Sequence, residues 1–368
     1  MKIVTIVGAR PQFIKAAAVS RAIAMHNQRL ENLSDVISEI IVHTGQHYDR
    51  NMSEVFFDEL EIPKPDENLG IGSGSHGQQT GEMLPRIEKI LLDKKPDWVM
   101  VYGDTNSTLA GAIAAVKLQI PVAHVEAGLR SFNRAMPEEH NRVLTDHCSE
   151  LLFCPTETSV TNLKKEGLYQ GIRLVGDVMH DSVLFYENLA EQKSKIIESL
   201  KLTPKGYCLA TVHRAENTDD IDKICSIFSA LDKVAKNVLP VIVPLHPRTK
   251  KQIISDNLDF PAIGMIEPVS YLDMLSLEKH AKFIMTDSGG VQKEAYWMKV
   301  PCITLRSETE WIETIQSGWN VIAGADANRI FQYAKSVNQP EEHPNVFGDG
   351  KSAEKIIAIL MNNGDLLQ

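Results

Sequence analysis

The sequence lacks several features that would define its class at once. No apolar run approaches the roughly 18 residues that cross a membrane. The five cysteines show neither CxxC nor Cys/His metal spacing, and their apolar or mixed surroundings are typical of reduced, buried thiols. A net charge of −10 argues against nucleic acid as a partner. These absences favour a cytoplasmic protein that binds neither membrane nor nucleic acid.

Two familiar nucleotide-binding motifs are incomplete. "GSGSHG", residues 72–77, matches G-x-G-x-x-G but follows a loop rather than a strand, which predicts a flexible loop and not a dinucleotide site. "FGDGKS" ends like a P-loop, but Asn345 stands where the first glycine is required, so we expect a turn before the final helix. We therefore expect no NAD and, from the cysteine and histidine spacing, no metal.

What is present is a regular alternation of strand-like and helix-like segments. A length of 368 residues favours two domains, and 43% apolar with 23% charged residues is ordinary for a soluble globular protein. Nearly continuous Val/Ile runs separated by helical patterns predict α/β domains with parallel sheets covered on both faces. The strand-like runs are "KIVTIVG", "VISEIIVHTG", "DWVMVYGD", "PVAHVE", "ELLFCP", "IRLVGD", "YCLATVH", "PVIVPLH", "AIGMIEP", "KFIMTDS", "PCITLR" and "NVIAG".

The glycine-flanked segment "EGLYQGI", residues 166–172, is the expected link between two Rossmann-like domains. We expect the two parallel sheets to face each other across a cleft. Ligands of such sheets bind beyond the carboxyl ends of the strands, so the residues after each strand are the candidates. They include Arg10, Lys15, Asp104 and Glu126 in the first half, and His213, His246 and the turn Ser288-Gly289-Gly290 in the second. Asp287 or Thr105 alone is better explained as a helix cap, but caps do not require histidines, arginines and a lysine.

The stretch "TDSGGVQKEA" indicates a phosphate site. Ser288-Gly289-Gly290 opens a helix, and its free N–H groups and dipole would hold a phosphate. Glu294, one turn later, could accept hydrogen bonds from ribose hydroxyls.

The stretch "HVEAGLRSFNRAMPEEHNR", residues 124–142, concentrates charge after a core strand. A carboxylate such as Glu126 at a strand's carboxyl end favours chemistry. Glu138 has a simpler explanation, in which it pairs with Arg130, Arg134 or Arg142 and only orders the loop.

These motifs, taken in order, resemble the non-hydrolysing UDP-N-acetylglucosamine 2-epimerases. The resemblance covers essentially the whole chain and is carried by "GARPQFIK", "HTGQHYDRNM", "YGDTNSTLAGA", "HVEAGLRSFNRAMPEEHNR", "PTE", "HRAEN", "IEPVSYLDML" and "TDSGGVQKEA". It implies the glycosyltransferase-B-type architecture, whose last helix crosses back to the N-terminal domain. The expected domains are thus residues 1–170 with 353–368, carrying the catalytic acids, and residues 171–352, binding UDP.

The resemblance also implies a reaction and its residues. UDP-GlcNAc and UDP-ManNAc would interconvert by elimination and re-addition of UDP, without a cofactor, in a cytoplasmic homodimer that supplies cell-surface polysaccharide precursors. The implied catalytic residues are Asp104, Glu126, Glu138 and His213. The implied UDP-binding residues are Arg10, Lys15, Arg142, Ser288, Gly289, Gly290 and Glu294.

A second, allosteric pocket is implied around Gln46 and His246, although "GSGSHGQQTGEML" departs from the loop of the best-known allosteric members. "GARPQF" and "SETEWIETIQSGWN" also depart from the commoner family patterns. Family members with similar departures in these motifs include epimerases of modified UDP-sugars, such as 2,3-diacetamido-glucuronic acid or N-acetyl-6-deoxy-talosamine. These modified UDP-sugars are the alternative substrate class. A hydrolysing epimerase and a metal-free glycosyltransferase are two further possible functions.

Overall fold

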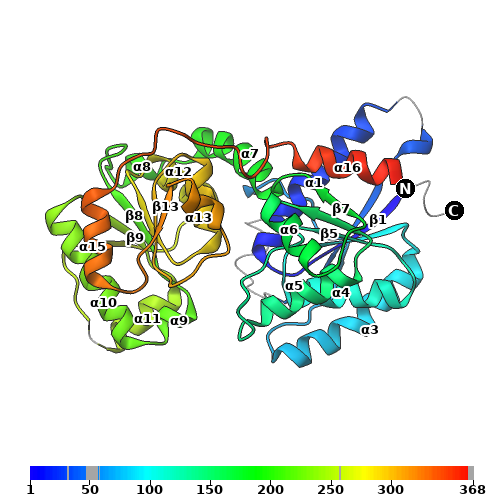
Figure 1. The fold of residues 1–368 in the computed structure, drawn as a ribbon, viewed down its shortest axis with the longest axis horizontal. Helices are drawn as coiled ribbons and strands as arrows, with labels where there is room; N and C mark the ends of the chain where they lie inside the picture. Colours follow the sequence, from blue (N-terminus) through cyan, green and yellow to red (C-terminus); the bar gives the residue numbers. More distant parts are fainter. Residues whose placement is uncertain (31–32, 47–56, 58, 257, 364–368) are drawn as a thin grey trace. The chain divides into compact units, whose positions relative to one another are not determined.

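The chain folds into two compact α/β units (Figure 1). The structure, a computed structural model, describes residues 1–30, 33–46, 57, 59–256 and 258–363. The first unit consists of Met1–Ser182 and Asn345–Gln368, and the second of Val183–Pro344. In the part of the chain that is described, no helix is long and apolar enough to cross a membrane.

The first unit is built on a seven-stranded sheet in the order β3-β2-β1-β4-β5-β6-β7, in which every pairing is parallel. Its strands are β1 (Lys2–Val7), β2 (Ser38–His43), β3 (Glu67–Asn68), β4 (Trp98–Tyr102), β5 (Val122–Val125), β6 (Leu151–Cys154) and β7 (Ile172–Leu174). The central strands β4, β5 and β6 are buried at every position, as expected where helices cover both faces.

Several helices of the first unit begin at residues suited to a helix N-terminus. Thr105 and Thr156 cap α4 and α6, and Pro11 stands in the first turn of α1. The helices are α1 (Arg10–Gln28), α3 (His76–Lys94), α4 (Asn106–Lys117), α5 (Pro137–Cys148), α6 (Glu157–Lys165) and α16 (Ser352–Asn363), with a 3₁₀ turn at Leu33–Asp35. Helix α16 packs beside α1 (Figure 1), which confirms that the C-terminal helix returns to the N-terminal unit.

The second unit has a six-stranded parallel sheet in the order β10-β9-β8-β11-β12-β13. Its strands are β8 (Cys208–Thr211), β9 (Val241–Pro244), β10 (Gly264–Ile266), β11 (Ile284–Thr286), β12 (Cys302–Thr304) and β13 (Asn320–Ile322). Its helices are α8 (Ile196–Ser199), α9 (Ala215–Thr218), α10 (Ile221–Asn237), α11 (Pro247–Ser255), α12 (Tyr271–His280), α13 (Gly289–Trp297), α14 (Ile312–Gln316) and α15 (Ala327–Ser336), and α7 (Val178–Lys193) spans the division between the units. Two parallel-sheet α/β units confirm the predicted fold class.

Each sheet changes its direction of winding at one point. Strand order reverses between β1 and β4 in the first unit, and between β8 and β11 in the second. Crossover helices leave a crevice at the carboxyl ends of strands at such a point. The segments that follow these four strands are Gly8–Arg10, Gly103–Asp104, Val212–His213 and Asp287–Gly289.

Three details differ from expectation. The units divide at Ser182 and Asn345, because "IRLVGD" forms β7 and pairs with β6 instead of opening the second sheet. Helix α3 begins at His76 with Ser75 as its cap, so the second half of "GSGSHG" is the start of a helix. Strand β3 escaped prediction because two polar residues carry no strand pattern.

Candidate active site

A buried ion pair lies at the carboxyl edge of the first sheet. Lys15, from the second turn of α1, contacts the carboxylate of Glu126, which directly follows β5. Both side chains are about nine-tenths buried, with relative exposures of 11% and 7%. Glu126 has φ +72°, a conformation that non-glycine residues rarely adopt and that is enriched at functional sites. A Cβ atom on Gly103 would lie 3.3 Å from the Glu126 carboxylate, so the backbone at this strand end leaves room for the pair.

A second charged group extends the same edge. Arg142 of α5 donates to the carboxylate of Asp104 at 2.5 Å and to that of Glu139 at 3.0 Å. The amide of Asn141 donates to the backbone carbonyl of Asp104 at 2.9 Å. Helix α5 thus holds Asp104 through both its side chain and its backbone.

Glu139, not Glu138, orders the loop between β5 and α5. Its carboxylate accepts hydrogen bonds from Ser131 N, Ser131 Oγ and Phe132 N, each at 2.9 Å, and from Arg142. Burial by itself would raise the pKa of Glu139, but these donors bring it below its ordinary value. Glu138 is half-buried in the first turn of α5 and forms no hydrogen bond or ion pair with any residue that the structure describes.

Among the described residues, Glu138 forms no ion pair with Arg130, Arg134 or Arg142, the arginines offered as its partners. Arg130 pairs with Asp146 at 2.7 Å and with Glu166 at 2.7 Å. The loop-ordering role suggested for Glu138 is therefore wrong, and Glu139 performs that task. Sequence reasoning missed Glu139, although its i,i+3 spacing to Arg142 on a helix was a usable signal.

A buried hydrogen-bond network around His124 holds the backbone next to Asp104 in place. The two ring nitrogens of His124 lie 2.7 Å from Asp146 Oδ1 and 2.8 Å from the carbonyl oxygen of Gly103. Burial alone would raise the pKa of Asp146, but His124 and Arg130 lower it below its ordinary value. Because Gly103 precedes Asp104, this network fixes the end of β4 that presents the acid.

Two other predicted residues lie near the helix starts of this edge. Gln46 Oε1 accepts hydrogen bonds from Ser107 N at 3.1 Å and Ser107 Oγ at 2.7 Å, so Gln46 stabilises the first turn of α4. Arg10 is the first residue of α1 and is half-buried. The remainder of the "HTGQHYDRNM" motif, residues 47–52, lies outside the described residues.

In the second unit, a buried aspartate holds the loop that carries His213. The carboxylate of Asp287 accepts from His213 N at 3.1 Å, Arg214 N at 3.0 Å and Asn217 Nδ2 at 3.1 Å. The expectation that Asp287 is a helix cap is wrong, because Ser288 caps α13 and Asp287 is committed to this loop; the same expectation for Thr105 is confirmed.

The two histidines predicted for this unit lie side by side. The rings of His213 and His246 are 5.7 Å apart. Burial lowers the pKa of His213, and Arg214 and His246 lower it further, although Asp287 opposes this. Burial also lowers the pKa of His246, with a contribution from Arg248. The neutral form of both rings therefore predominates at pH 7.

The turn Ser288-Gly289-Gly290 opens α13, as predicted. A Cβ atom on Gly289 would lie 3.4 Å from Trp311 Nε1 and 3.9 Å from a guanidinium nitrogen of Arg214. An indole N–H and a cation therefore lie near a helix N-terminus, an arrangement suited to an anion.

Glu294 is buried one turn into α13 and accepts a hydrogen bond from Tyr271 at 2.9 Å. Glu278 of α12 is fully buried, and neither of its carboxylate oxygens has a hydrogen-bond partner among the described residues. Burial raises the pKa of Glu278 well above its ordinary value, and the charge of Glu294 adds to the effect. Burial therefore favours the protonated form of Glu278, and nothing in its sequence neighbourhood identified it.

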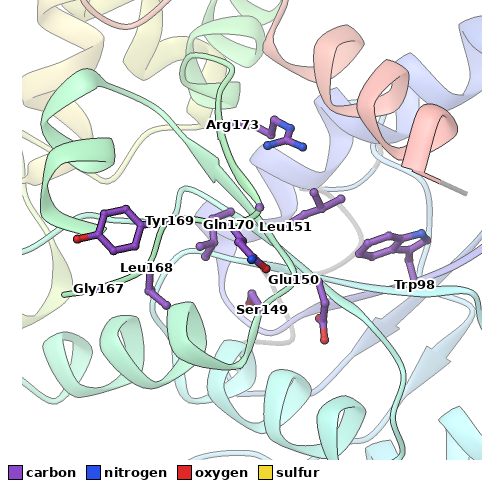
Figure 2. A pocket seen from close by; sticks show the side chains of 11 residues that line it. Trp98, Ser149, Glu150, Leu151, Gly167, Leu168, Tyr169, Gln170 and Arg173 are labelled. Carbon is purple, nitrogen blue, oxygen red and sulfur yellow. The ribbon is translucent and has the colours of Figure 1, made fainter. Parts of the chain in front are cut away.

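The pocket of about 670 Å³ in the first unit lies at the other end of the sheet (Figure 2). Trp98 and Leu151, the first residues of β4 and β6, line it together with Tyr169 and Arg173. It contains none of the predicted site residues. Among the described residues, no cluster of three or more His, Cys, Asp or Glu side chains could hold a metal ion.

Comparison with known proteins gives one consistent result. A family model described as UDP-N-acetylglucosamine 2-epimerase matches residues 29–361. The chain is 55% identical to a UDP-N-acetylglucosamine 2-epimerase homolog of Methanococcus maripaludis, over 98% of this chain and 100% of that protein. It is 49% identical to the UDP-2,3-diacetamido-2,3-dideoxy-D-glucuronate 2-epimerase of Pseudomonas aeruginosa, over 98% of this chain and 99% of that protein.

A solved structure agrees with the sequence relatives. The UDP-GlcNAc 2-epimerase of Methanocaldococcus jannaschii, in complex with UDP-GlcNAc and UDP, superposes with a TM-score of 0.88 at 45% identity, covering 98% of this chain and 100% of that one. With 98% of the chain covered, the match extends through both units. The chain belongs to the UDP-N-acetylglucosamine 2-epimerase family.

Proposed function

We propose that this protein interconverts UDP-GlcNAc and UDP-ManNAc by non-hydrolysing epimerisation at C2. The observation that carries the proposal is that two ion pairs, Lys15–Glu126 and Arg142–Asp104, lie near the point where strand order reverses between β1 and β4. The chain that contains them belongs to this family. Acids held by cations at the carboxyl edge of a parallel sheet are suited to proton transfer and charge stabilisation.

The proposed reaction has two half-steps. A base removes the C2 proton while the C1–O bond breaks, the C1–C2 double bond forms and UDP departs with the bonding electrons. The 2-acetamidoglucal then receives a proton at C2 on the opposite face, and UDP re-adds at C1. Positive charge develops at C1 as UDP departs, so carboxylates near the sugar stabilise the transition state.

We assign the sugar chemistry to the acids Asp104, Glu126 and Glu138 and assistance of UDP departure to His213. Lys15 and Arg142 orient Glu126 and Asp104, since each is paired with that acid. The lack of a protein partner for Glu138 among the described residues supports a role toward a ligand. A neutral His213 supports proton transfer at pH 7.

We assign UDP binding to residues that offer cations, N–H donors or a ribose acceptor. These are Arg10, Lys15, Arg142, Ser288, Gly289, Gly290 and Glu294. The support for the last four is that Ser288 and the glycines begin α13, and that Glu294 lies one turn further on. We keep Gln46 and His246 as a proposed second nucleotide-sugar site.

A modified UDP-sugar is the alternative substrate. The 49% identity with the P. aeruginosa enzyme, whose name specifies a diacetamido-glucuronate, supports this substrate class. The 45% identity with the M. jannaschii UDP-N-acetylglucosamine 2-epimerase supports the parent sugar.

Product analysis by NMR separates the candidates. The protein is incubated with UDP-GlcNAc, or with a panel of modified UDP-sugars, in deuterated water. Elimination and re-addition place deuterium at C2 of both epimers, while hydride return from NAD would not. Release of free UDP and ManNAc would indicate a hydrolysing enzyme, and an absence of any exchange at C2 would overturn the proposal.

We further propose a cytoplasmic homodimer that supplies precursors for cell-surface polysaccharides such as lipopolysaccharide O-antigen or capsule. The five cysteines are free, and burial raises the pKa of the Cys154, Cys208 and Cys302 thiols, which supports a reducing compartment. Light scattering tests the dimer.

A further inference from the structure

Phe132 has an unusual position in the loop between β5 and α5. Its side chain is 71% exposed, and its backbone has φ +59°. The left-handed region disfavours residues with a Cβ, and a bulky side chain there is an outlier. An exposed phenyl ring in a disfavoured conformation requires a cause.

The cause of the conformation lies in the site. Glu139 Oε1 accepts the backbone N–H of Phe132 at 2.9 Å, and its other oxygen accepts both donors of Ser131. Glu139 is itself buried and bonded to Arg142, which holds Asp104. The loop that presents the ring is therefore tied to the proposed catalytic acids through consecutive hydrogen bonds and ion pairs.

A second exposed aromatic residue of the same unit provides a contrast. Tyr169 is 72% exposed and precedes β7, at the amino edge of the sheet, in the pocket of Figure 2. The backbone of Tyr169, unlike that of Phe132, does not adopt a positive φ. Exposure alone therefore does not distinguish Phe132; its enforced conformation and its connection to Asp104 do.

We infer that Phe132 contacts the amino sugar of the UDP-sugar and contributes to selection of that sugar; this inference rests on the proposed function. The loop runs from Glu126 to Glu138, two of the acids assigned to the sugar chemistry. An aromatic ring presents an apolar surface to the C–H groups of a pyranose ring and to the methyl group of an acetamido substituent. The left-handed backbone of Phe132 costs conformational free energy in the protein without substrate. The contact with bound substrate is the function that accounts for this cost.

Three variants test the inference through binding. Affinities for UDP-GlcNAc and for UDP are measured by calorimetry on wild type, Phe132→Ala, Phe132→Gly and the control Tyr169→Ala. We expect both Phe132 variants to bind UDP-GlcNAc about 5- to 10-fold more weakly, because part of an apolar side-chain contact is lost, and to bind UDP like wild type. Tyr169→Ala should match wild type with both ligands.

Melting temperature separates this role from a structural one. Glycine adopts a positive φ without strain, so Phe132→Gly should melt no lower than wild type while still losing sugar affinity. Unchanged UDP-GlcNAc affinity in both variants would overturn the inference. Equal losses for UDP and UDP-GlcNAc, or a marked fall in the melting temperature of Phe132→Gly, would also overturn it. These readouts need no turnover, so they remain distinct from the test of epimerisation.

Discussion

The ammonium group of Lys15 contacts the carboxylate of Glu126 in a buried position, although the two residues lie 111 positions apart in the chain. Strand β1 pairs in parallel with β4, and β4 with β5. The segments that follow β1 and β5, which carry Lys15 and Glu126, therefore lie at the same edge of the sheet. Both side chains are about nine-tenths buried, so removing Glu126 leaves the Lys15 charge uncompensated, which typically costs about 3 to 5 kcal/mol of stability.

Glu126→Gln should lose both activity and stability. Turnover should fall about 100- to 10,000-fold, as is usual for loss of a general acid or base, while UDP affinity changes little. The double variant Lys15→Met/Glu126→Gln should recover part of the lost stability, because no buried charge is left unpaired, but none of the activity. Unfolding in urea and turnover by NMR give the two readouts. Recovery of activity in the double variant would show that Glu126 is structural.

Glu138→Gln and Glu139→Gln should have opposite signatures. Glu138 has no partner in the described chain, so its variant should melt like wild type and lose at least about 100-fold in turnover. Glu139 accepts four hydrogen bonds, so its variant should lose about 1 to 3 kcal/mol of stability, because charge-assisted bonds to backbone and Arg142 are weakened.

Thermal melting and turnover, measured on both variants, decide this assignment. A low melting temperature with near-normal turnover for Glu138→Gln would contradict it.

His213→Asn should impair both turnover and UDP affinity, because the proposed role of this ring in UDP departure involves binding as well as chemistry. Burial lowers the pKa of His213 below its ordinary value of 6.5, so the neutral ring dominates at pH 7. Protonation of His213 should therefore affect the acidic limb of the wild-type rate profile only below pH 6.5. His246→Asn is the control, since His246 is assigned to the second site. An equal loss of basal turnover in both variants would contradict a specific role for His213.

Glu278→Gln should stabilise the protein at neutral and alkaline pH. The folded carboxyl has a pKa raised well above 4.5 by burial, whereas the unfolded one titrates near its ordinary value. Above pH 4.5 the unfolded state therefore releases a proton that the folded state keeps, and the free energy of unfolding falls as pH rises. Glutamine does not titrate, so the variant should lose this decline.

Melting temperature measured from pH 5 to pH 9 tests this effect, with the exposed Glu341→Gln as the control. An identical pH dependence in wild type and Glu278→Gln would show that the carboxyl is not protonated in the folded state.

Local patterns were sufficient for much of the architecture. Continuous Val/Ile runs predicted every strand except β3, because burial on both faces demands apolar residues at successive positions. Residues at strand ends predicted which side chains share one edge of each sheet, because parallel strands present their carboxyl ends there. The Ser288-Gly289-Gly290 turn predicted the start of α13 through cap chemistry, which acts within four residues.

The tertiary structure alone decided which charges pair. Arg142 could have reached Glu138 or Glu139, and the return of the loop to α5 selected Glu139. Segment 171–174 could have opened a second sheet, but the exposed edge of β6 was available to pair with it. Caps and periodicity depend on neighbours along the chain, whereas partner choice depends on which groups the sheet brings within a few ångströms and which of them lose their water.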